Sequence, residues 1–365
     1  MNKKILLAFA VFALFFQQNS IAQKYSNEFL AIGVGARAHG MSGAVTATTG
    51  DVFSSYWNPA GLTNIVDAPF QIGAMHAEWF GGVAKYDFLG FAKPLNADRG
   101  SVMALSLVRL GIDNIPYTLN LVGPDGSINY DNISSFSAAD YAFQMSYAQR
   151  LKNPNFSIGG NVKIIRRVIG SFAAAWGVGA DFGIQYKKGN WRLAAVGRDI
   201  TTTYNAWTAT LTDAEKITFA NTNNTIPVSS VEVTKPTIFL AAAYVTPLSK
   251  SINLTVETDL GFATDGQRNV LVSSKAFNVD PRFGFELEYQ KAIWLRGGVG
   301  NFQRIKNETD PTKKDLNFQP NIGVGLKLGR LTVDYALTNI GNVSQVLYSH
   351  IFSLKLDFKA PKAKV

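Results

Sequence analysis

The sequence predicts an all-β protein: a 14-stranded antiparallel transmembrane β-barrel with an N-terminal hatch, or plug, segment. Three observations predict this fold. An export signal opens the chain, alternating apolar and polar residues dominate after residue 67, and short connections alternate with long ones. Together these features are typical of barrels that cross a bacterial outer membrane.

The first 22 residues predict a secretory signal peptide. "MNKK" supplies a basic start, "ILLAFAVFALFF" an apolar core, and Ser20 and Ala22 a small-residue cleavage site, so we expect cleavage after Ala22. A retained membrane anchor is the less favoured alternative, because the apolar run is shorter than a bilayer requires. We therefore expect the mature protein to be exported to the bacterial outer membrane.

Composition excludes several classes of function. The chain has 365 residues, a formal net charge of +9 and no cysteine. Without cysteine there are no disulfides, no Cys-based metal sites and no Cys nucleophiles, so burial and backbone pairing must hold the fold. The basic residues are scattered and the chain is exported, which argues against nucleic-acid binding. After the signal peptide, the sequence contains no predominantly apolar run of 18 residues, so it predicts no transmembrane helix.

Residues after the hatch read as strands, because side chains alternate between two faces. In "RFGFELEYQ", Phe283, Phe285 and Leu287 fall on one face, while Arg282 and Glu286 fall on the other. Most such segments have about 10 to 15 residues, enough to cross a bilayer when tilted. The expected strands are 69–78, 84–94, 100–111, 138–150, 154–169, 172–188, 190–199, 235–247, 250–264, 281–290, 292–303, 316–328, 330–341 and 346–359.

The connections give the strongest evidence for a barrel. Every second connection is a short turn, and these turns read "LNADR", "KNP", "KGN", "PLSK", "QKA" and "GR". The others include the long segments 112–137, 200–234, 265–280 and 303–315, although those near 80, 170 and 343 are short. A transmembrane barrel has short periplasmic turns and long outer loops, and its closure satisfies every backbone group in lipid. We expect segment 200–234 to carry a hairpin of its own.

The segment before the first strand does not follow the barrel pattern. Residues 27–66 are rich in glycine and small residues and carry few charges, so the segment can fold into the lumen and fill it. The expected boundaries are 1–22 for the signal peptide, 23–66 for the hatch, 67–359 for the barrel and 360–365 for a basic periplasmic tail.

Two stretches of the hatch carry a family resemblance. "GARAHGMSGA" (35–44) and "SSYWNPAGL" (54–62) resemble the start of mature FadL-like outer-membrane proteins, and among these most closely the PorV/PorQ group of Bacteroidota. PorV departs from this chain in having an alanine-lysine at the place of Ala60-Gly61. The matched hatch positions are Gly35, Ala36, Arg37, Gly40, Met41, Gly43, Trp57, Asn58, Pro59 and Ala60.

The resemblance implies a non-enzymatic role in protein transport. A PorV-like barrel would be a component of the type IX secretion system and would bind or shuttle cargo through the cargo's C-terminal signal domain. Its partners would be the translocon, those cargo domains and outer-membrane lipid. Within this interpretation, loops 112–137 and 200–234 form the expected contact surface.

The motif residues also predict local structure in the hatch. We expect Asn58-Pro59 to force a turn, Trp57 to pack against the barrel wall and Gly61 to allow a close approach. Arg37 is the one formal charge of the glycine-rich part, and we expect it to pair with an inward carboxylate such as Glu257, Asp259, Glu286 or Asp334. The alternative places Arg37 in water at the periplasmic mouth.

A second function remains open: a FadL-like passive transporter of hydrophobic small molecules, such as long-chain fatty acids. That function requires an apolar pocket in the barrel. The alternation instead predicts a polar, solvated lumen, which favours the secretion role, and its inward charges are Glu257, Asp259, Arg282, Glu286, Asp334 and Lys355. A structural partner of another membrane complex is a third possibility.

Signals for enzyme chemistry are weak. "GVGARA" matches a relaxed dinucleotide fingerprint, but no βαβ unit surrounds it. The histidines are His39, His76 and His350, and their spacing fits no metal motif. We expect no catalytic site, no cofactor and no metal.

Overall fold

The computed structural model describes residues 26–65, 68–96, 100–121, 127–221, 225–226, 228–307, 309–310, 312–340 and 348–358. The expected signal peptide (1–22) and basic tail (360–365) lie outside the described residues.

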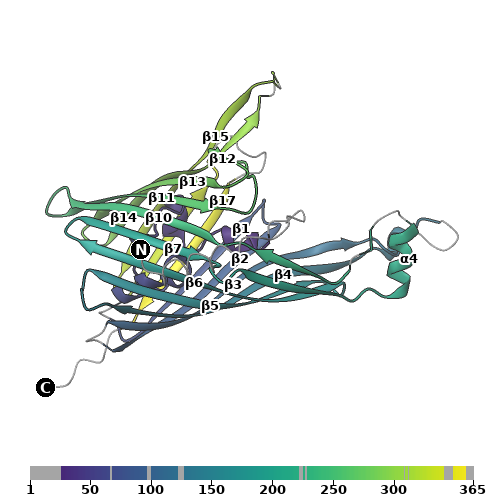
Figure 1. The fold of residues 1–365 in the computed structure, drawn as a ribbon, viewed down its shortest axis with the longest axis horizontal. Coiled ribbons are helices and arrows are strands. Elements are labelled where there is room, and N and C mark those ends of the chain that lie inside the picture. Colours follow the sequence, from purple (N-terminus) through teal and green to yellow (C-terminus); the bar gives the residue numbers. More distant parts are fainter. Residues whose placement is uncertain are drawn as a thin grey trace, which may run out of the picture.

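Fourteen of the described strands form one closed antiparallel barrel, which confirms the expected fold class (Figure 1). Each strand pairs with its neighbour along the chain, β7 pairs with β10 and β11 with β13, and β1 closes the ring by pairing with β17. The barrel strands are β1 (Gln71–Trp79), β2 (Ala84–Asn96), β3 (Ser101–Tyr117), β4 (Ser134–Arg150), β5 (Phe156–Ile169), β6 (Ala173–Lys188), β7 (Trp191–Arg198), β10 (Thr237–Pro247), β11 (Ile252–Ala263), β13 (Asn278–Tyr289), β14 (Ile293–Lys306), β15 (Lys314–Leu328), β16 (Leu331–Thr338) and β17 (Ser349–Asp357).

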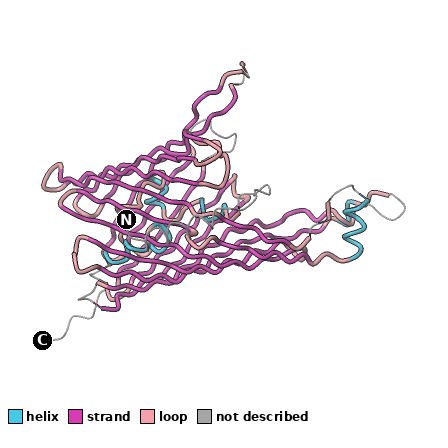
Figure 2. The backbone as a smooth tube through the Cα atoms, viewed as in Figure 1, coloured by secondary structure: helices cyan, strands magenta, loops and turns pink. Residues whose placement is uncertain are grey.

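The long outer connection 200–234 does contain a hairpin. Strand β8 (Thr203–Ala209) pairs with β9 (Ser230–Thr234) and also with the outer half of β6. Helix α4 (Asp213–Asn221) lies between these two strands, and a two-residue strand, β12 (Val272–Ser273), pairs with β13. Together with β3 to β6, the hairpin β8–β9 and helix α4 form an extension beyond the barrel, with α4 at its tip (Figures 1 and 2).

The hairpin β3–β4 extends farther out than expected, so the predicted loop 112–137 is shorter. Pairing continues past a β-bulge between Ile112 and Ile115, where Asn114 has a φ of 58°. The 3-10 helix η3 (Tyr130–Asn132) follows in the loop. Aromatic packing holds the extended ends, because the Phe172 ring stacks on Tyr117 at 5.6 Å and meets Phe136 edge-on at 5.0 Å.

The outer surface of the barrel is apolar, as the alternation predicted. Phe283 and Phe285 point outward and are 43% and 42% exposed, while Glu286, the next residue after Phe285, faces inward and is 8% exposed. This surface suits lipid, and a closed barrel satisfies its own backbone hydrogen bonds there, so the architecture supports an outer-membrane location. Among the described residues, no helix is both long and apolar enough to cross a membrane.

The hatch lies inside the barrel. It contains η1 (Glu28–Ala31), α2 (Ala36–Gly40), α3 (Ser54–Trp57) and η2 (Pro59–Asn64). Helix α2 contacts β14 to β17, whereas η2 contacts β3 to β6, so the two helices touch opposite walls. The main hydrophobic core lies between the hatch and one side of the barrel, and its barrel members include Met75, Tyr86, Phe88, Val102, Val108, Ile165, Ala336 and Ile351.

Candidate functional site: the hatch and the pocket above it

The turn at "WNPAG" is built by its own sequence. The side-chain oxygen of Asn58 accepts a hydrogen bond from the Ala60 amide at 3.1 Å, and Pro59 occupies the first position of η2. The Asn58 amide group donates to the carbonyls of Thr46, at 3.0 Å, and of Ile184 in β6, at 3.3 Å. Asn58 therefore joins the turn both to the rest of the hatch and to the barrel wall.

Trp57 packs mainly within the hatch, which corrects the expectation that it packs on the wall. Its indole Nε1 donates to the Val34 carbonyl at 2.8 Å, and its ring lies against Gly33 and Gly43. From the wall, a charged group contacts the ring: the guanidinium carbon of Arg198 lies 5.2 Å from the centre of the Trp57 ring. The hatch backbone at Gly33, Val34 and Gly43 thus supplies close contacts to the indole.

Glycines allow hatch and wall to approach closely. A Cβ at position 61 would lie 2.4 Å from the Thr49 carbonyl oxygen, so Gly61 permits the close approach that the sequence suggested. A Cβ at Gly40 would lie 3.0 Å from the Cα of Gly323 in β15. These positions leave no room for a side chain.

The remaining matched positions shape the first half of the hatch. Gly35 and Gly43 have φ angles of 85° and 79°, a backbone region that favours glycine. Met41 is fully buried and lies against two glycines of the wall, Gly284 and Gly298. A side chain at either wall position would meet the backbone of Met41, so both glycines let this part of the hatch approach the wall closely.

Arg37 joins the hatch to the wall through Glu286. Its Nε and Nη2 donate to the two carboxylate oxygens of Glu286 at 2.9 and 3.1 Å. Glu286 also accepts from Nε of Arg296 at 2.6 Å, and Arg296 donates to Asp334 at 2.6 Å. Arg37 is therefore one member of a chain of ion pairs, and it is not an unpaired arginine in water, although its side chain is 24% exposed.

Two other expected lumen charges cap the hatch backbone. Glu257 and Asp259 are 1% and 0% exposed, and they accept hydrogen bonds from the amides of Ala47, at 2.5 Å, and Thr46, at 3.1 Å. Glu257 also accepts from the Thr48 hydroxyl at 2.5 Å. The sequence predicted a solvated row, but these carboxylates are buried, because hatch donors replace the water that would otherwise hydrate them.

The last two expected lumen charges are partly buried and paired. Lys355 Nζ donates to Asp51 of the hatch at 3.2 Å. Arg282 Nη2 donates to Asp280 on its own strand at 3.2 Å. Five of the six expected lumen charges, all but Arg282, thus belong to one ionic interface between the hatch and strands β11 to β17.

The histidines serve structure. His39 Nε2 lies 3.0 Å from the Gly33 carbonyl oxygen inside the hatch, and burial lowers the pKa of His39 to about 4. His76 and His350 face outward, where they contact Asp87 at 2.7 Å and Tyr335 at 2.8 Å. Within the described ranges, no group of three His, Asp or Glu side chains could hold a metal ion.

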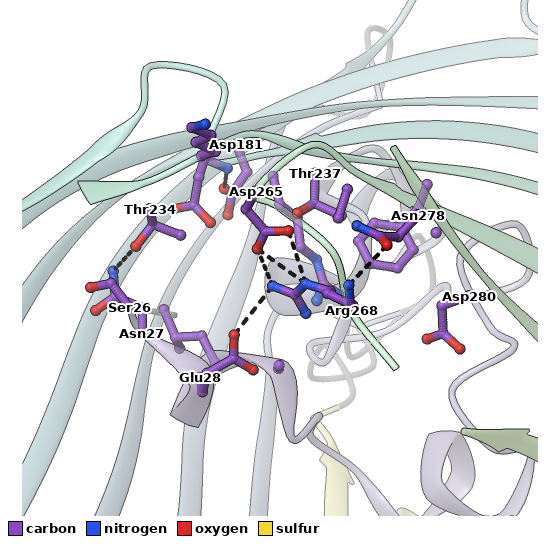
Figure 3. Close-up of a pocket in the computed structure, with 18 of the residues that line it drawn as sticks. Ser26, Asn27, Glu28, Asp181, Thr234, Thr237, Asp265, Arg268, Asn278 and Asp280 are labelled. Carbon is purple, nitrogen blue, oxygen red and sulfur yellow. Dashed lines mark hydrogen bonds and ion pairs between the residues drawn. The ribbon is translucent and has the colours of Figure 1, made fainter. Parts of the chain in front are cut away.

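Above the hatch lies a pocket of about 140 Å³ (Figure 3). Hatch residues from Ser26 to Tyr56 form one side, and inward side chains of β4 to β7, β10, β11 and β13 form the other. Its carboxylates are mostly held by three cations: Lys163 pairs with Asp181 (2.8 Å) and Asp199 (2.7 Å), Arg268 with Glu28 (3.3 Å) and Asp265, and Arg282 with Asp280.

Sequence reasoning missed this pocket. Its residues come from seven barrel strands, the outer connections after β7 and after β11, and the hatch, and no spacing along the chain brings them together. The alternation predicts which strand residues face the lumen, and Arg198 is one of them. It does not show which of these residues lie beside the hatch. Arg198 and Phe239 were therefore not singled out.

Comparison with known proteins agrees on the fold. No family model and no curated protein matches the chain. Solved structures that resemble it include the CymD monoaromatic hydrocarbon channel (13% identity, TM-score 0.54, covering 92% of this chain and 100% of that one). The Ralstonia pickettii toluene transporter TbuX (12%, 0.54, 89% and 98%) and the Pseudomonas putida toluene transporter TodX (12%, 0.55, 90% and 99%) are similar. At these identities the likeness shows that the chain shares the barrel fold of these channels.

Proposed function

We propose that the protein is a passive outer-membrane channel for small organic molecules with a hydrophobic part, and that the hatch controls their passage. The observation that supports this proposal is the pocket directly above the hatch, inside a barrel whose fold is that of hydrocarbon channels. A ligand site of this kind combines apolar walls with a few polar groups. Here Leu30, Tyr56 and Phe239 supply apolar surface among the charged pairs.

The opposite mouth of the barrel supports a path through the lumen. A second cavity of about 500 Å³ lies on the other side of the hatch, near the short turns that we assign to the periplasm. Arg150, Gln185 and Lys187 are among its lining residues, and Gln185 and Arg150 donate to hatch carbonyls. The hatch separates the two cavities, so its movement would connect them.

The test is uptake by intact cells, since hydrocarbons cross simple phospholipid bilayers unaided. Cells with a lipopolysaccharide outer leaflet and no channel of this class would express the protein, and uptake of radiolabelled toluene would be timed. We expect uptake several-fold faster than in cells with an empty vector. Equal rates, with the folded barrel present in the outer membrane, would refute the channel function.

A second candidate function is the secretion role expected from the PorV-like resemblance. The outer extension favours it, because large apolar side chains are exposed there to water: Tyr130 is 71% exposed, Ile217 60% and Val231 63%. Exposed apolar patches of this kind often bind proteins. The extension contains the described parts of both expected contact loops, 112–137 and 200–234.

Purification from the native membrane in mild detergent would test this second function. Co-purified proteins that share a C-terminal domain, lost when 112–137 or 200–234 is deleted, would support secretion. If the deletions leave such an interaction intact, the loops are not the contact surface. Bound hydrophobic molecules without protein partners would favour the channel.

A further inference from the structure

We infer that Arg198 makes the outer pocket a binding site for a small organic acid, a carboxylate carried on a body of about one ring. The inference rests on the proposed channel function and names its substrate class.

Arg198 is a cation without an anion. It ends β7 and lines the pocket, yet it forms no ion pair with any described carboxylate, and its buried Nε finds no acceptor among the described residues. The five carboxylates that line the pocket each pair with another cation, Lys163, Arg268 or Arg282. A buried guanidinium donor without an acceptor is costly, so this position favours an anionic ligand.

Aromatic rings fix how a ligand can approach Arg198. The guanidinium carbon lies 4.7 Å from the Tyr56 ring centre, 5.2 Å from that of Trp57 and 4.8 Å from that of Phe239. Rings at these distances attract the cation, but they supply no oxygen acceptor for its N–H donors. A carboxylate supplies such acceptors and matches a guanidinium with two parallel hydrogen bonds.

The size of the pocket limits the rest of the ligand. Its volume is about 140 Å³, close to the ~150 Å³ of an engineered cavity that binds benzene. One ring or a short branched chain therefore fits, whereas a long acyl chain does not. Leu30, Tyr56 and Phe239 offer apolar contact to such a body.

The position of Arg198 connects the ligand to the hatch. Tyr56 and Trp57 belong to α3 of the hatch, whereas Arg198 belongs to the wall. A carboxylate that draws the guanidinium toward the pocket would weaken its contact with these two rings. Ligand binding and release of the hatch would then use the same residue.

Calorimetric titration of the purified full-length mature protein, in detergent at pH 7.5, tests this site. The probes are benzoate and its neutral analogue benzamide. We expect the native protein to bind benzoate at least about tenfold more tightly than benzamide, as hydrogen bonds to charged groups require. Arg198→Gln should remove this preference by weakening benzoate about tenfold or more while leaving benzamide nearly unchanged.

Arg166→Gln is the matched control. Arg166 also lies over an aromatic ring, at 4.8 Å from Trp176, but it is not among the residues that line the pocket. This variant should retain the native preference. If Arg198→Gln fails to fold, as judged by heat-dependent migration in gels, the comparison of benzoate with benzamide on the native protein decides alone.

Two outcomes overturn the inference: equal binding of benzoate and benzamide by the native protein, or an unchanged preference in Arg198→Gln. Toluene uptake by cells separates these outcomes from failure of the channel function. If cells take up toluene but the protein binds benzoate and benzamide equally, the acid site is refuted and the channel function is supported. If the protein prefers benzoate but cells take up no toluene, the acid site is supported and the channel function is refuted.

Discussion

The hatch meets the barrel through two interfaces that differ in chemistry. Toward β1–β5 the contact is apolar: Val52 and Phe53 of the hatch pack against barrel side chains that include Phe88. Toward β11–β17 the contact is ionic, and it contains Glu257, Glu286 and Arg296 together with the hatch backbone. The same segment is thus held by burial on one side and by charge on the other.

This difference in chemistry indicates which of the two interfaces separates first. When two apolar surfaces separate, water contacts them, and this exposure costs roughly 25 cal/mol per Å² of apolar surface. Buried charges that separate into water recover their hydration, which offsets much of the lost attraction. We therefore expect the hatch to stay attached at the apolar wall and to open at the ionic wall.

The largest effect is expected from Trp57→Ala on the hatch core. Loss of a buried tryptophan costs about 3–5 kcal/mol, and this indole also donates to the Val34 carbonyl. Amide hydrogen exchange of residues 33–64 should accelerate strongly. Trp191→Ala, at an outward position that is 54% exposed, should leave exchange in the hatch unchanged; equal acceleration in both variants would contradict the account.

Breaking the ionic interface should cost slightly less. Glu286→Gln leaves Arg37 without its carboxylate partner and Arg296 with Asp334 alone, so we expect the hatch to lose about 3 kcal/mol. Arg37→Met leaves the Glu286–Arg296 pair intact, and its cost should be about 1 kcal/mol. The same exchange experiment compares them, and a larger cost for Arg37→Met would reverse the assignment of Glu286 as the centre of the network.

A smaller effect is expected where the hatch packs on itself. Gly61→Ala places a methyl group 2.4 Å from the Thr49 carbonyl oxygen, and overpacking of this kind costs about 1–3 kcal/mol. Exchange near residues 46–50 should accelerate while the barrel keeps its stability. Unchanged exchange there would mean that the backbone relaxes freely, which the tight hatch described above does not allow.

The last expected effect concerns pH. The pKa of His39 is lowered to about 4 in the fold by burial, whereas an unfolded histidine titrates near ~6.5. The fold favours the neutral ring, so hatch stability is complete above the unfolded pKa and falls as pH decreases toward the folded one, by about 2 kcal/mol at pH 5. Hydrogen exchange at pH 7.5 and 5.0, corrected for intrinsic rates, should show this loss, and His39→Asn should lack that part of it.

Strands were predictable because their signal is local. Alternation has a period of two, so "RFGFELEYQ" alone assigns Phe283 outward and Glu286 inward, and each of the 14 expected strands overlaps an observed one. The ends were less predictable. Asn114 and Pro116 are typical of turns, yet a bulge carries β3 past them to Tyr117.

The site was predictable only in part, because its contacts join distant segments. The sequence marked most charges of the ionic interface but not Arg296 or Asp51. It also could not show that hatch amides bury Glu257 and Asp259 from 210 and 213 residues away. It placed Trp57 on the wall, whereas Val34 and the hatch glycines enclose it. Arg198 carries no local signal, since its lack of an ion pair with any described carboxylate is visible only once the nearby carboxylates are located.

The most direct test of a hatch-controlled channel is a reversible tether at the ionic wall. A Cβ at Gly300 of β14 would lie 3.5 Å from the Cβ of Ser42 in the hatch, within the ~3.5–4.5 Å range of disulfides, and the chain has no cysteine of its own. In cells that express Ser42→Cys/Gly300→Cys, we expect toluene uptake to stop when the pair is oxidised and to recover on reduction. Equal uptake in the oxidised and reduced states would contradict opening at this wall.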